Sequence, residues 1–369
     1  MHEVVVVGGG PAGCLAAREA ARNSARVLLC EEHSKIGVPA RCSGLISKTG
    51  LDSLGIDYSE SILNSVRGVN IYSPLFNTMH IKSSETKAHV LDRTRFDTLC
   101  SQEAESEGAE IKLNARIHEL PSNSLIIGAD GANSFVARTL DFPKITRFVA
   151  CYQAEFEGLH LSERESVHVF LSNELFPGLF GWVIPVNEEK ARVGVGVSIG
   201  ARISPKTSFN SLLQFPAVRE LLGEANEISY HASIIPMEAR SQTANERALL
   251  VGDAAGQVKA TTGGGVVFGC SCAKLAGKLA AQGEHLNYES AWRAEFGNDL
   301  ELHSKLRALV DSLSDEKLNS YFGLAKRAGA ERFLEEHGDM DKPSSMLGAL
   351  KKLNIPFLDL YTKFFNIAV

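Results

Sequence analysis

Three observations in the sequence predict an α/β fold. The apolar run Val4 to Val7 leads into the glycine-rich segment Gly8 to Gly13, and a second apolar strand, Val27 to Cys30, ends at Glu31. Another glycine-rich turn follows a buried strand near Asp253, more than two hundred residues later. Long segments between them alternate apolar and polar residues, which is typical of antiparallel sheets. We therefore expect a Rossmann-type α/β domain, an inserted antiparallel β-sheet domain and a helical C-terminal region.

The first segment predicts a dinucleotide-binding βαβ unit. Val4 to Val7 form the buried parallel strand, and the glycines allow a tight turn and the close approach of a pyrophosphate. A helix that begins near Pro11 directs its backbone N–H groups at the phosphates. Glu31 follows at the interval at which an acid accepts hydrogen bonds from a ribose 2′-OH. A glycine turn in an ordinary α/β domain is the alternative, but the strand, helix and acid together favour a nucleotide cofactor.

Composition narrows the class of protein. A chain of 369 residues with 44% hydrophobic content can bury a large core and divide into two or three lobes. A net charge of −6 without a basic block argues against a nucleic-acid partner. No apolar run reaches the roughly 18 residues that span a bilayer, and Met1 leads directly into a strand, so we expect a cytoplasmic protein without signal peptide or transmembrane anchor.

The seven cysteines are scattered and mostly lie in apolar stretches, which is typical of reduced thiols. Cys270 and Cys272 lie two apart on a predicted helix and face different directions. Core packing is therefore the better interpretation of this pair, and we expect no metal site.

The segment from Lys35 to Gly44 contains glycines and a proline and shows no regular hydrophobic period, which predicts a loop. Loops that leave the carboxyl ends of parallel strands handle ligands, so Arg41 and Cys42 are candidates for contact with the reactive end of the cofactor. A surface arginine beside a buried thiol is the alternative.

The next segments predict short strands, one helix and a return to the parallel sheet. The helix begins at Asp92, which can cap it, and stops near Gly108. The last strand ends in Ala129-Asp130-Gly131, as at the carboxyl edge of a parallel sheet. The predicted strands are Val69–Ser73, Thr78–Lys82, Ala88–Leu91, Ala109–Ile117 and Ser124–Gly128.

Four alternating segments then predict the antiparallel sheet, one face of which is available to cover the cofactor: Phe148–Phe156, Val167–Leu171, Gly181–Val186 and Ala191–Ile199. A dense apolar patch lies within them and includes one of the two tryptophans. These side chains could form either the core of the sheet or the wall of an apolar substrate pocket, and the sequence leaves both interpretations open. They are Phe176, Phe180, Trp182, Ile184 and Pro185.

A polar amphipathic helix, Ser208–Leu222, and a strand, Ile228–Ile235, precede the second glycine turn. There a buried strand presents Asp253, and the glycines from Gly263 to Gly265 present the amino end of a helix that runs to Ala281. An aspartate in that place can bind hydroxyls of a sugar-alcohol chain, and the helix end can stabilise an anion. Two such turns on one sheet fit a long two-part cofactor, and FAD is the natural choice.

The remainder of the chain, from about Asn287, is helical in pattern and charged. Residues 353–369 are unusually aromatic. We expect them to pack against the body of the protein, with contact to a membrane surface as the alternative.

Together these motifs resemble the FAD-dependent fold of the aromatic hydroxylase type. Within that fold, three segments look like the geranylgeranyl reductase family: Ile36 to Cys42, the Gly-Trp-Val-Ile-Pro patch from Gly181 to Pro185, and Thr262 to Gly265. The likeness extends to about residue 285. It implies an FAD-binding domain formed by residues 1–68, 91–146 and 235–285, a substrate domain formed by 69–90 and 147–234, and a helical region at 286–369.

The resemblance also implies roles for single residues. The pyrophosphate would be held by Gly8, Gly10, Ala12 and Gly13, and the adenosine ribose by Glu31. Contacts to FAD or its surroundings would come from Arg41, Cys42, Arg93 and Asp253, and Gly263, Gly264, Gly265 and Val266 would approach the isoalloxazine. The family's Tyr-x-Trp-x-Phe-Pro pattern departs here to Phe180-Gly181-Trp182-Val183-Ile184-Pro185, so the tyrosine hydroxyl is absent.

Members of this family saturate carbon–carbon double bonds of prenyl chains on lipids, chlorophyll precursors or quinones. For this chain the resemblance implies a prenyl lipid or quinone substrate, with Cys42 as the candidate proton donor. NADPH, ferredoxin or a deazaflavin remain open as the electron donor, because no second Rossmann unit is predicted. A flavin monooxygenase or halogenase and a non-catalytic FAD electron relay are the alternative functions.

Overall fold

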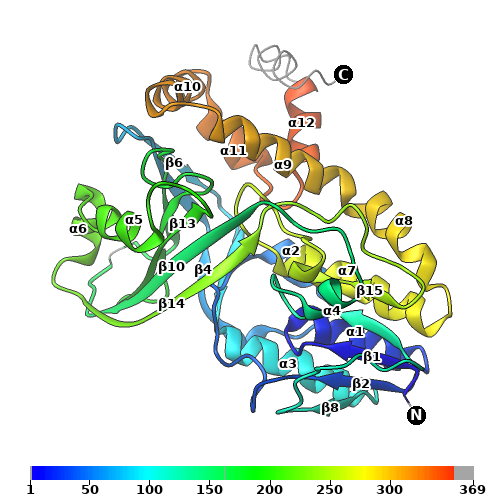
Figure 1. The fold of residues 1–369 in the computed structure, drawn as a ribbon. Coiled ribbons are helices and arrows are strands. Elements are labelled where there is room, and N and C mark those ends of the chain that lie inside the picture. Colours follow the sequence, from blue (N-terminus) through cyan, green and yellow to red (C-terminus); the bar gives the residue numbers. More distant parts are fainter. Residues whose placement is uncertain (1, 162, 353–369) are drawn as a thin grey trace. The chain divides into compact units, whose positions relative to one another are not determined.

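The computed structural model describes residues 2–161 and 163–352, which fold into two compact units (Figure 1). Unit 1 contains the chain up to Ile62, Leu91–Phe148 and Ile235–Leu300. Unit 2 contains Leu63–Val90, Val149–Ile234 and the chain from Glu301 onward. The helices after the second glycine turn are therefore divided between the two units.

Unit 1 is built on a five-stranded parallel sheet with the strand order β15-β9-β1-β2-β8. Its register aligns Val7 with both Cys30 and Gly128, and Gly128 with Leu250. The carboxyl ends of four strands consequently meet at one edge of the sheet, where ligands bind in folds of this class. The strands are β1 (Val4–Val7), β2 (Val27–Cys30), β8 (Glu110–Lys112), β9 (Leu125–Gly128) and β15 (Ala248–Leu250).

Three long helices pack on this sheet: α1 (Pro11–Arg22), α3 (Arg93–Ser106) and α7 (Val266–Ala281). Small residues bring α1 and α7 close together, since a Cβ on Gly277 would lie 2.2 Å from the carbonyl oxygen of Ala16. Asp92 caps α3 as predicted, by accepting the N–H of Arg95. The shorter helices of unit 1 are α2 (Lys48–Leu54), α4 (Phe135–Thr139), α8 (Tyr288–Trp292), η1 (Ser59–Ser61), η2 (Gly252–Ala254), η3 (His285–Asn287) and η4 (Arg293–Gly297).

Unit 2 contains a seven-stranded sheet with the order β14-β10-β13-β12-β11-β5-β6. Neighbours from β10 to β11 are antiparallel, as predicted, but β11 pairs parallel with β5, so the sheet as a whole is mixed. The expectation of a purely antiparallel sheet was wrong in this one pairing. The strands are β5 (Gly68–Tyr72), β6 (Thr78–Lys82), β10 (Phe148–Glu157), β11 (Ser166–Phe170), β12 (Gly181–Pro185), β13 (Lys190–Ser198) and β14 (Asn226–Pro236).

Two further sequence predictions differ from the structure. The single helix predicted over Ser208–Leu222 is two helices, α5 (Pro205–Leu212) and α6 (Pro216–Leu222), because Pro216 cannot continue a helix and instead begins one. The strand predicted over Ala109–Ile117 is limited to β8, because the chain turns at Asn114, whose φ is +53° and whose N–H donates to the carbonyl of His33.

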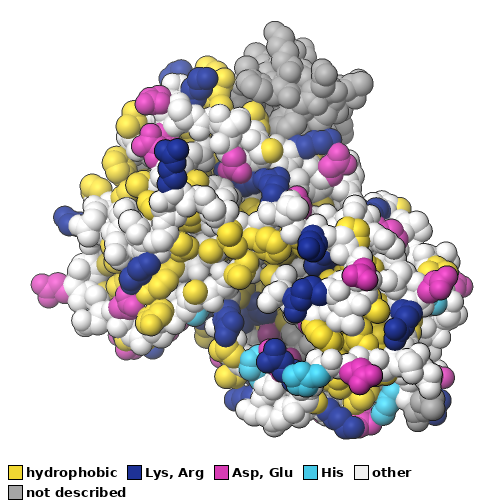
Figure 2. Space-filling model, in the orientation of Figure 1, with side chains coloured by type: hydrophobic (Ala, Val, Ile, Leu, Met, Phe, Trp, Pro, Cys, Tyr) yellow, Lys and Arg dark blue, Asp and Glu magenta, His cyan; other side chains and the backbone are white. Residues whose placement is uncertain are grey.

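The remaining elements are the short strands β3 (Leu45–Ser47), β4 (Ile62–Val66) and β7 (Ala88–Leu91), and the helices α9 (Asn298–Asp311), α10 (Asp315–Arg327), α11 (Ala330–His337) and α12 (Pro343–Lys352). The aromatic segment 353–369 lies outside the described residues. None of the helices described is both long and apolar enough to cross a bilayer. Acidic and basic side chains are interspersed over the face shown in Figure 2.

Candidate functional site

The turn after β1 can be formed only by glycines. Gly8 adopts a φ of +104°, and a Cβ on it would lie 2.4 Å from the carbonyl oxygen of Ala129. A Cβ on Gly13 would lie 1.9 Å from the carbonyl oxygen of Gly8. Both distances are far below van der Waals contact, so these glycines let the start of α1 approach the ends of β1 and β9.

The amino end of α1 is open to a ligand. Gly10 is its N-cap and makes no side-chain cap, and Pro11 takes the first helical position, where no N–H is needed. A Cβ on Gly10 would meet no described atom within 4 Å. The N–H groups of the first turn therefore face free space and suit an anion such as a pyrophosphate.

Glu31 lies beside this turn at the end of β2. One carboxylate oxygen accepts the N–H of Gly9 at 2.7 Å, and the other accepts the N–H of His33 at 2.9 Å and contacts the ring of the same histidine. Only 9% of the Glu31 surface is exposed. These bonds fix the carboxylate in the position expected for an acid that binds ribose hydroxyls.

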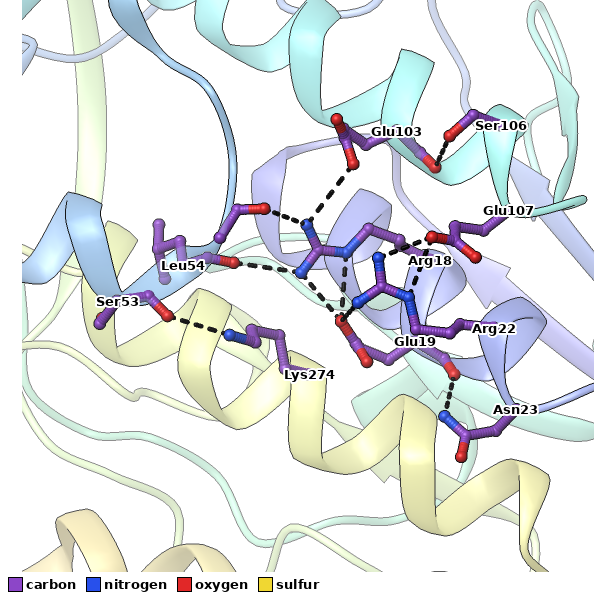
Figure 3. Close-up of polar contacts among 11 residues, drawn as sticks. Arg18, Glu19, Arg22, Asn23, Ser53, Leu54, Glu103, Ser106, Glu107 and Lys274 are labelled. Carbon is purple, nitrogen blue, oxygen red and sulfur yellow. Dashed lines mark hydrogen bonds and ion pairs between the residues drawn. The ribbon is translucent and has the colours of Figure 1, made fainter.

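A buried arginine of α1, Arg18, joins this helix to its neighbours (Figure 3). Arg18 is 1% exposed and donates to the carbonyls of Leu54 and Gly55 at 3.1 and 3.0 Å, with Glu103 of α3 at 4.0 Å. From α7, Lys274 donates to the carbonyl of Ser53. Helices α1, α2, α3 and α7 are thus tied together by charge-assisted contacts, which fixes the direction of α1.

The second glycine turn presents Asp253. Among the described residues, no side-chain or backbone donor forms a hydrogen bond to its carboxylate, and one of its oxygens would lie 2.9 Å from a Cβ on Gly265. Burial raises the pKa of Asp253 to about 6, and the charge of Arg93 opposes this shift. A half-buried carboxylate that lacks a donor fits the prediction that it binds hydroxyls of a sugar-alcohol chain.

Gly263 adopts a φ of +72°, and Gly265 is the N-cap of α7 without a side-chain cap. The amino end of this helix therefore lacks a side-chain cap, as does that of α1, but the Asp253 carboxylate lies beside it. Gly263, Gly264 and Gly265 lead directly into α7, which begins at Val266, and Gly265 lies beside Asp253.

The loop after β2 places Cys42 against Arg93. The guanidinium lies close enough to the Cys42 sulfur for the two groups to interact electrostatically, and the sulfur accepts the N–H of Gly44 at 3.4 Å. Arg93 is held in turn by two hydrogen bonds to Asp97, of 2.9 and 3.1 Å. Burial acts to lower the pKa of Arg93, but Asp97 and then Cys42 raise it above its ordinary value. The arginine therefore remains a fixed cation beside a half-buried thiol.

Arg41, the neighbour of Cys42, is exposed and forms no hydrogen bond with any residue that the structure describes. Unit 1 thus brings Cys42, Arg93, Asp253 and the second glycine turn to one end of the sheet, whereas Arg41 extends to the surface. Its role as a cofactor contact remains a prediction.

Two residues, Gln257 and Asp130, support the site through contacts that the sequence did not reveal. Gln257 is fully buried, accepts the N–H of Gly252 at 2.9 Å and donates to the hydroxyl of Tyr288, which donates to the carbonyl of Leu250. This chain of bonds fixes the turn that carries Asp253. A polar residue in an apolar, small-residue stretch was the only sequence signal.

Asp130, at the end of β9, is the second. One of its oxygens accepts the N–H groups of Phe135 and Val136, and the other is buried without a hydrogen-bond partner. The strand ending in Ala-Asp-Gly was the available signal, but it did not indicate that a carboxylate oxygen is left unsatisfied.

The predicted apolar wall lies in unit 2 and is divided between the faces of its sheet. Phe176 is fully buried in the cluster that includes Val183, Val193 and the residues of α5 and α6. Trp182 and Ile184 alternate with Val183 along β12 and so face the other side. Trp182 donates to Gln153 at 2.9 Å, and a Cβ on Gly194 would lie 2.4 Å from its ring.

Phe180 packs edge-on against Trp182, with ring centroids 6.0 Å apart, and Pro185 ends β12 on the face of Val183. The structure therefore separates the five predicted side chains into core packing and a Trp182 face, which consists of Phe180, Trp182 and Ile184. Across residues 2–161 and 163–352, no three His, Cys, Asp or Glu side chains are placed to share a metal ion.

The residues of unit 1 fit FAD at both of its ends. The open amino end of α1 and Glu31 suit the pyrophosphate and adenosine ribose. The Asp253 carboxylate without a donor and the uncapped amino end of α7 suit the ribityl chain and the flavin ring.

Comparison with known proteins agrees with this assignment. Residues 3–126 match a family model described as FAD dependent oxidoreductase, and residues 122–285 match one described as FAD binding domain. Digeranylgeranylglycerophospholipid reductase 2 of Methanopyrus kandleri is 30% identical over 362 residues, which are 86% of this chain and 89% of that protein. An uncharacterised protein of Methanocaldococcus jannaschii is 28% identical over 386 residues, 96% of each chain.

Among solved structures, a geranylgeranyl bacteriochlorophyll reductase-like protein from Thermoplasma acidophilum has the same fold. The two structures superpose with a TM-score of 0.81 at 21% identity, covering 99% of both chains. The cofactor of the present chain is FAD.

Proposed function

Because this chain belongs to the geranylgeranyl reductase family and is an FAD-dependent oxidoreductase, we propose that it saturates carbon–carbon double bonds of geranylgeranyl or related prenyl chains on a lipid or quinone. The observation that carries the proposal is the 30% identity, over most of both chains, to a digeranylgeranylglycerophospholipid reductase. The Cys42–Arg93 pair at the flavin end of unit 1 supplies the acid that such a reaction needs.

In this proposal, Gly8, Gly10, Ala12 and Gly13 surround the pyrophosphate, and Glu31 holds the adenosine ribose. Asp253 binds the ribityl hydroxyls, and the turn of Gly263, Gly264, Gly265 and Val266 lies against the ring, with Arg41 at its rim. FAD, when bound and reduced, supplies a hydride to one carbon of the double bond. The protein must then supply a proton to the other carbon, since saturation adds two hydrogens.

Cys42 is the proposed proton donor. Its Sγ–H bond breaks as a C–H bond forms, which leaves a thiolate. That negative charge would be stabilised by the Arg93 guanidinium and by the N–H of Gly44, which already contact the sulfur. Because Cys42 is half-buried rather than fully enclosed, the thiolate can regain a proton from solvent between turnovers.

The prenyl chain has no polar group near the double bond, so its binding must come from apolar contact and the exclusion of water. We assign this contact to the Trp182 face. Phe176 and Pro185 act behind it by fixing β12 from the core side. Loss of an aromatic side chain from the Trp182 face would therefore weaken substrate binding without affecting the binding of FAD.

Two other functions use the same fold. A flavin monooxygenase or halogenase would consume oxygen and modify a different substrate, and the halogenase pattern carries a tryptophan where Phe180 stands here. A non-catalytic electron relay would exchange electrons with a carrier and leave lipids unchanged. The Cys42–Arg93 pair favours the reductase, because neither alternative requires a proton donor at that place.

The electron donor is proposed to be NADPH, ferredoxin or a deazaflavin that docks transiently. A long-chain lipid substrate resides in a membrane, so we propose that the protein contacts a membrane surface peripherally while it takes up substrate. Flotation of the protein with liposomes that contain the substrate lipid tests this contact.

The test of the function is anaerobic reduction of the purified FAD protein, followed by addition of geranylgeranyl lipids and mass spectrometry of the products. We expect a mass gain of two hydrogens for each double bond reduced. An oxygen-dependent, hydroxylated or halogenated product would establish the first alternative, and electron exchange without any change in the lipid would establish the second.

A further inference from the structure

Lys259 is a buried cation at the second glycine turn. Only 6% of its surface is exposed. Its Cε and Nζ atoms lie 2.9 and 3.3 Å from the position that a Cβ on Gly264 would occupy. Lysine is rarely buried to this extent, because removing an ammonium group from water costs free energy unless other groups stabilise it. The ammonium group of Lys259 is therefore held at this turn and away from bulk water.

The backbone of Lys259 fixes this charge relative to the turn. Its N–H donates to the carbonyl of Gly264 at 3.1 Å, and its own carbonyl accepts the N–H groups of Thr262 and Gly263 at 3.1 and 2.8 Å. Lys259 and Gly264 also form an isolated antiparallel bridge. Displacement of the Lys259 backbone would thus open the turn that precedes α7.

Charged side chains lie at two places around the second glycine turn, one beside Gly265 and one beside Gly264. Asp253 lies next to Gly265, and the cation that opposes its pKa shift is Arg93, which also holds Asp97 and Cys42. Lys259 lies against Gly264. The Lys259 ammonium and the positive amino end of α7 therefore lie at the same turn.

We propose that Lys259 sets the reduction potential of the bound FAD by stabilising the negative charge that the flavin gains when it is reduced. Two electrons and one proton from the electron donor convert the neutral oxidised ring into an anion. A nearby buried cation interacts with the anion much more strongly than with the neutral ring, and only such a differential interaction shifts the equilibrium. The inference requires bound FAD, and it does not depend on the identity of the alkene substrate.

The test is the two-electron midpoint potential of the FAD protein, measured by anaerobic spectroelectrochemistry without substrate. Lys259→Met removes the charge and keeps much of the side-chain length, and Lys259→Arg keeps the charge. Lys278→Met is the matched control, since Lys278 is exposed in the last turn of the same helix that begins at Gly265.

We expect Lys259→Met to bind reduced FAD about tenfold more weakly relative to oxidised FAD, which corresponds to a midpoint potential lower by about 30 mV. Lys259→Arg and Lys278→Met should stay within about 10 mV of the wild type. A Lys259→Met protein that holds FAD at the wild-type potential would overturn the proposal. Lys259→Gln serves as a second neutral variant. If both neutral variants lose oxidised FAD while Lys259→Arg retains it, the charge is needed for cofactor binding as such, and the redox role is rejected.

Discussion

Gly10 and Gly13 lie three residues apart and are constrained in different ways. Gly13 has no room for a methyl group, whereas the space beside Gly10 is open and suits the pyrophosphate. We expect Gly13→Ala to destabilise the apoprotein by about 1–3 kcal/mol through overpacking. Gly10→Ala should cost less than about 1 kcal/mol of stability yet weaken FAD binding. Urea unfolding of the apoproteins and FAD titration separate the two effects. Equal stability of both variants would contradict this description of the turn.

Cys42 is predicted to donate a proton and to have no part in cofactor retention. Cys42→Ala should keep bound FAD and lower the rate of alkene reduction by about 10²–10⁴-fold, the usual contribution of a general acid. The measurement is single-turnover reduction of a prenyl lipid by the pre-reduced protein. Cys42→Ser, which keeps a group able to carry a proton, serves as the comparison and should retain more activity. Unaltered turnover in Cys42→Ala would remove Cys42 from the mechanism.

Asp253 links pH to stability. Its pKa of about 6 exceeds the ordinary value of 3.8, so the folded apoprotein holds this proton more tightly than the unfolded chain. Stability attributable to Asp253 should therefore be present below about pH 4 and fall as the pH rises to about 6. Asp253→Asn should remove this slope and stabilise the apoprotein at pH 7 by about 1–3 kcal/mol, while weakening FAD binding. Urea unfolding of the wild type and Asp253→Asn from pH 4 to 7.5 measures the difference in stability between them. Parallel pH profiles of the two proteins would refute the role of Asp253.

At the scale of single residues, the sequence identifies those whose type and spacing are unusual, such as Glu31 and the glycines of the two turns. It does not identify residues whose importance comes from burial. Lys259 and Gln257 lie in an ordinary small-residue stretch, and only the fold shows that their polar groups are buried against the second glycine turn. Asp130 follows a strand end that is visible in the sequence, but its unsatisfied oxygen is not.

At the scale of elements, α8 supports the strand end that presents Asp253. The Tyr288 hydroxyl donates to the carbonyl of Leu250 in β15 and accepts a hydrogen bond from Gln257. Tyr288→Phe leaves buried polar groups unpaired and should cost about 1–3 kcal/mol. Tyr58→Phe, which removes an exposed hydrogen bond to Asp52, is the control and should cost less. Denaturant unfolding of the apoproteins checks both values, and equal costs would mean that the buried network does not stabilise β15.

Elements with a strong local pattern were predicted closely, and those decided by long-range pairing were not. The strands β1, β2, β6 and β7 have the predicted bounds. β1 and β2 are apolar runs, and β6 is a short alternating segment, each ended by turn residues that leave little freedom. The parallel pairing of β5 with β11 joins residues about a hundred positions apart and has no local signature. The break at Pro216 was visible in the sequence, and the single predicted helix neglected it.

At the scale of the whole molecule, the sequence predicted the fold class, and the structure and its relatives confirm it. Unit 1 is assembled from three separate segments because parallel strands need crossover connections, and long crossovers can hold a second domain. The chain leaves unit 1 first at Leu63–Val90 and again at Val149–Ile234. The sheet of unit 2 combines β5 and β6 from the first of these segments with strands from the second. The division of the last helices between the units was not predicted, since helical pattern alone does not show which partner a helix packs against.

The central claim is that electrons on this protein's FAD are used to saturate a prenyl double bond. The most direct measurement is an anaerobic single turnover, in which the pre-reduced protein is mixed with a geranylgeranyl lipid. Flavin reoxidation is followed by absorbance, and the mass of the lipid is measured by mass spectrometry. We predict one equivalent of flavin reoxidised for each two hydrogens gained by the lipid. Flavin that stays reduced with every prenyl lipid tested, or is reoxidised without any gain of hydrogen, would contradict the claim.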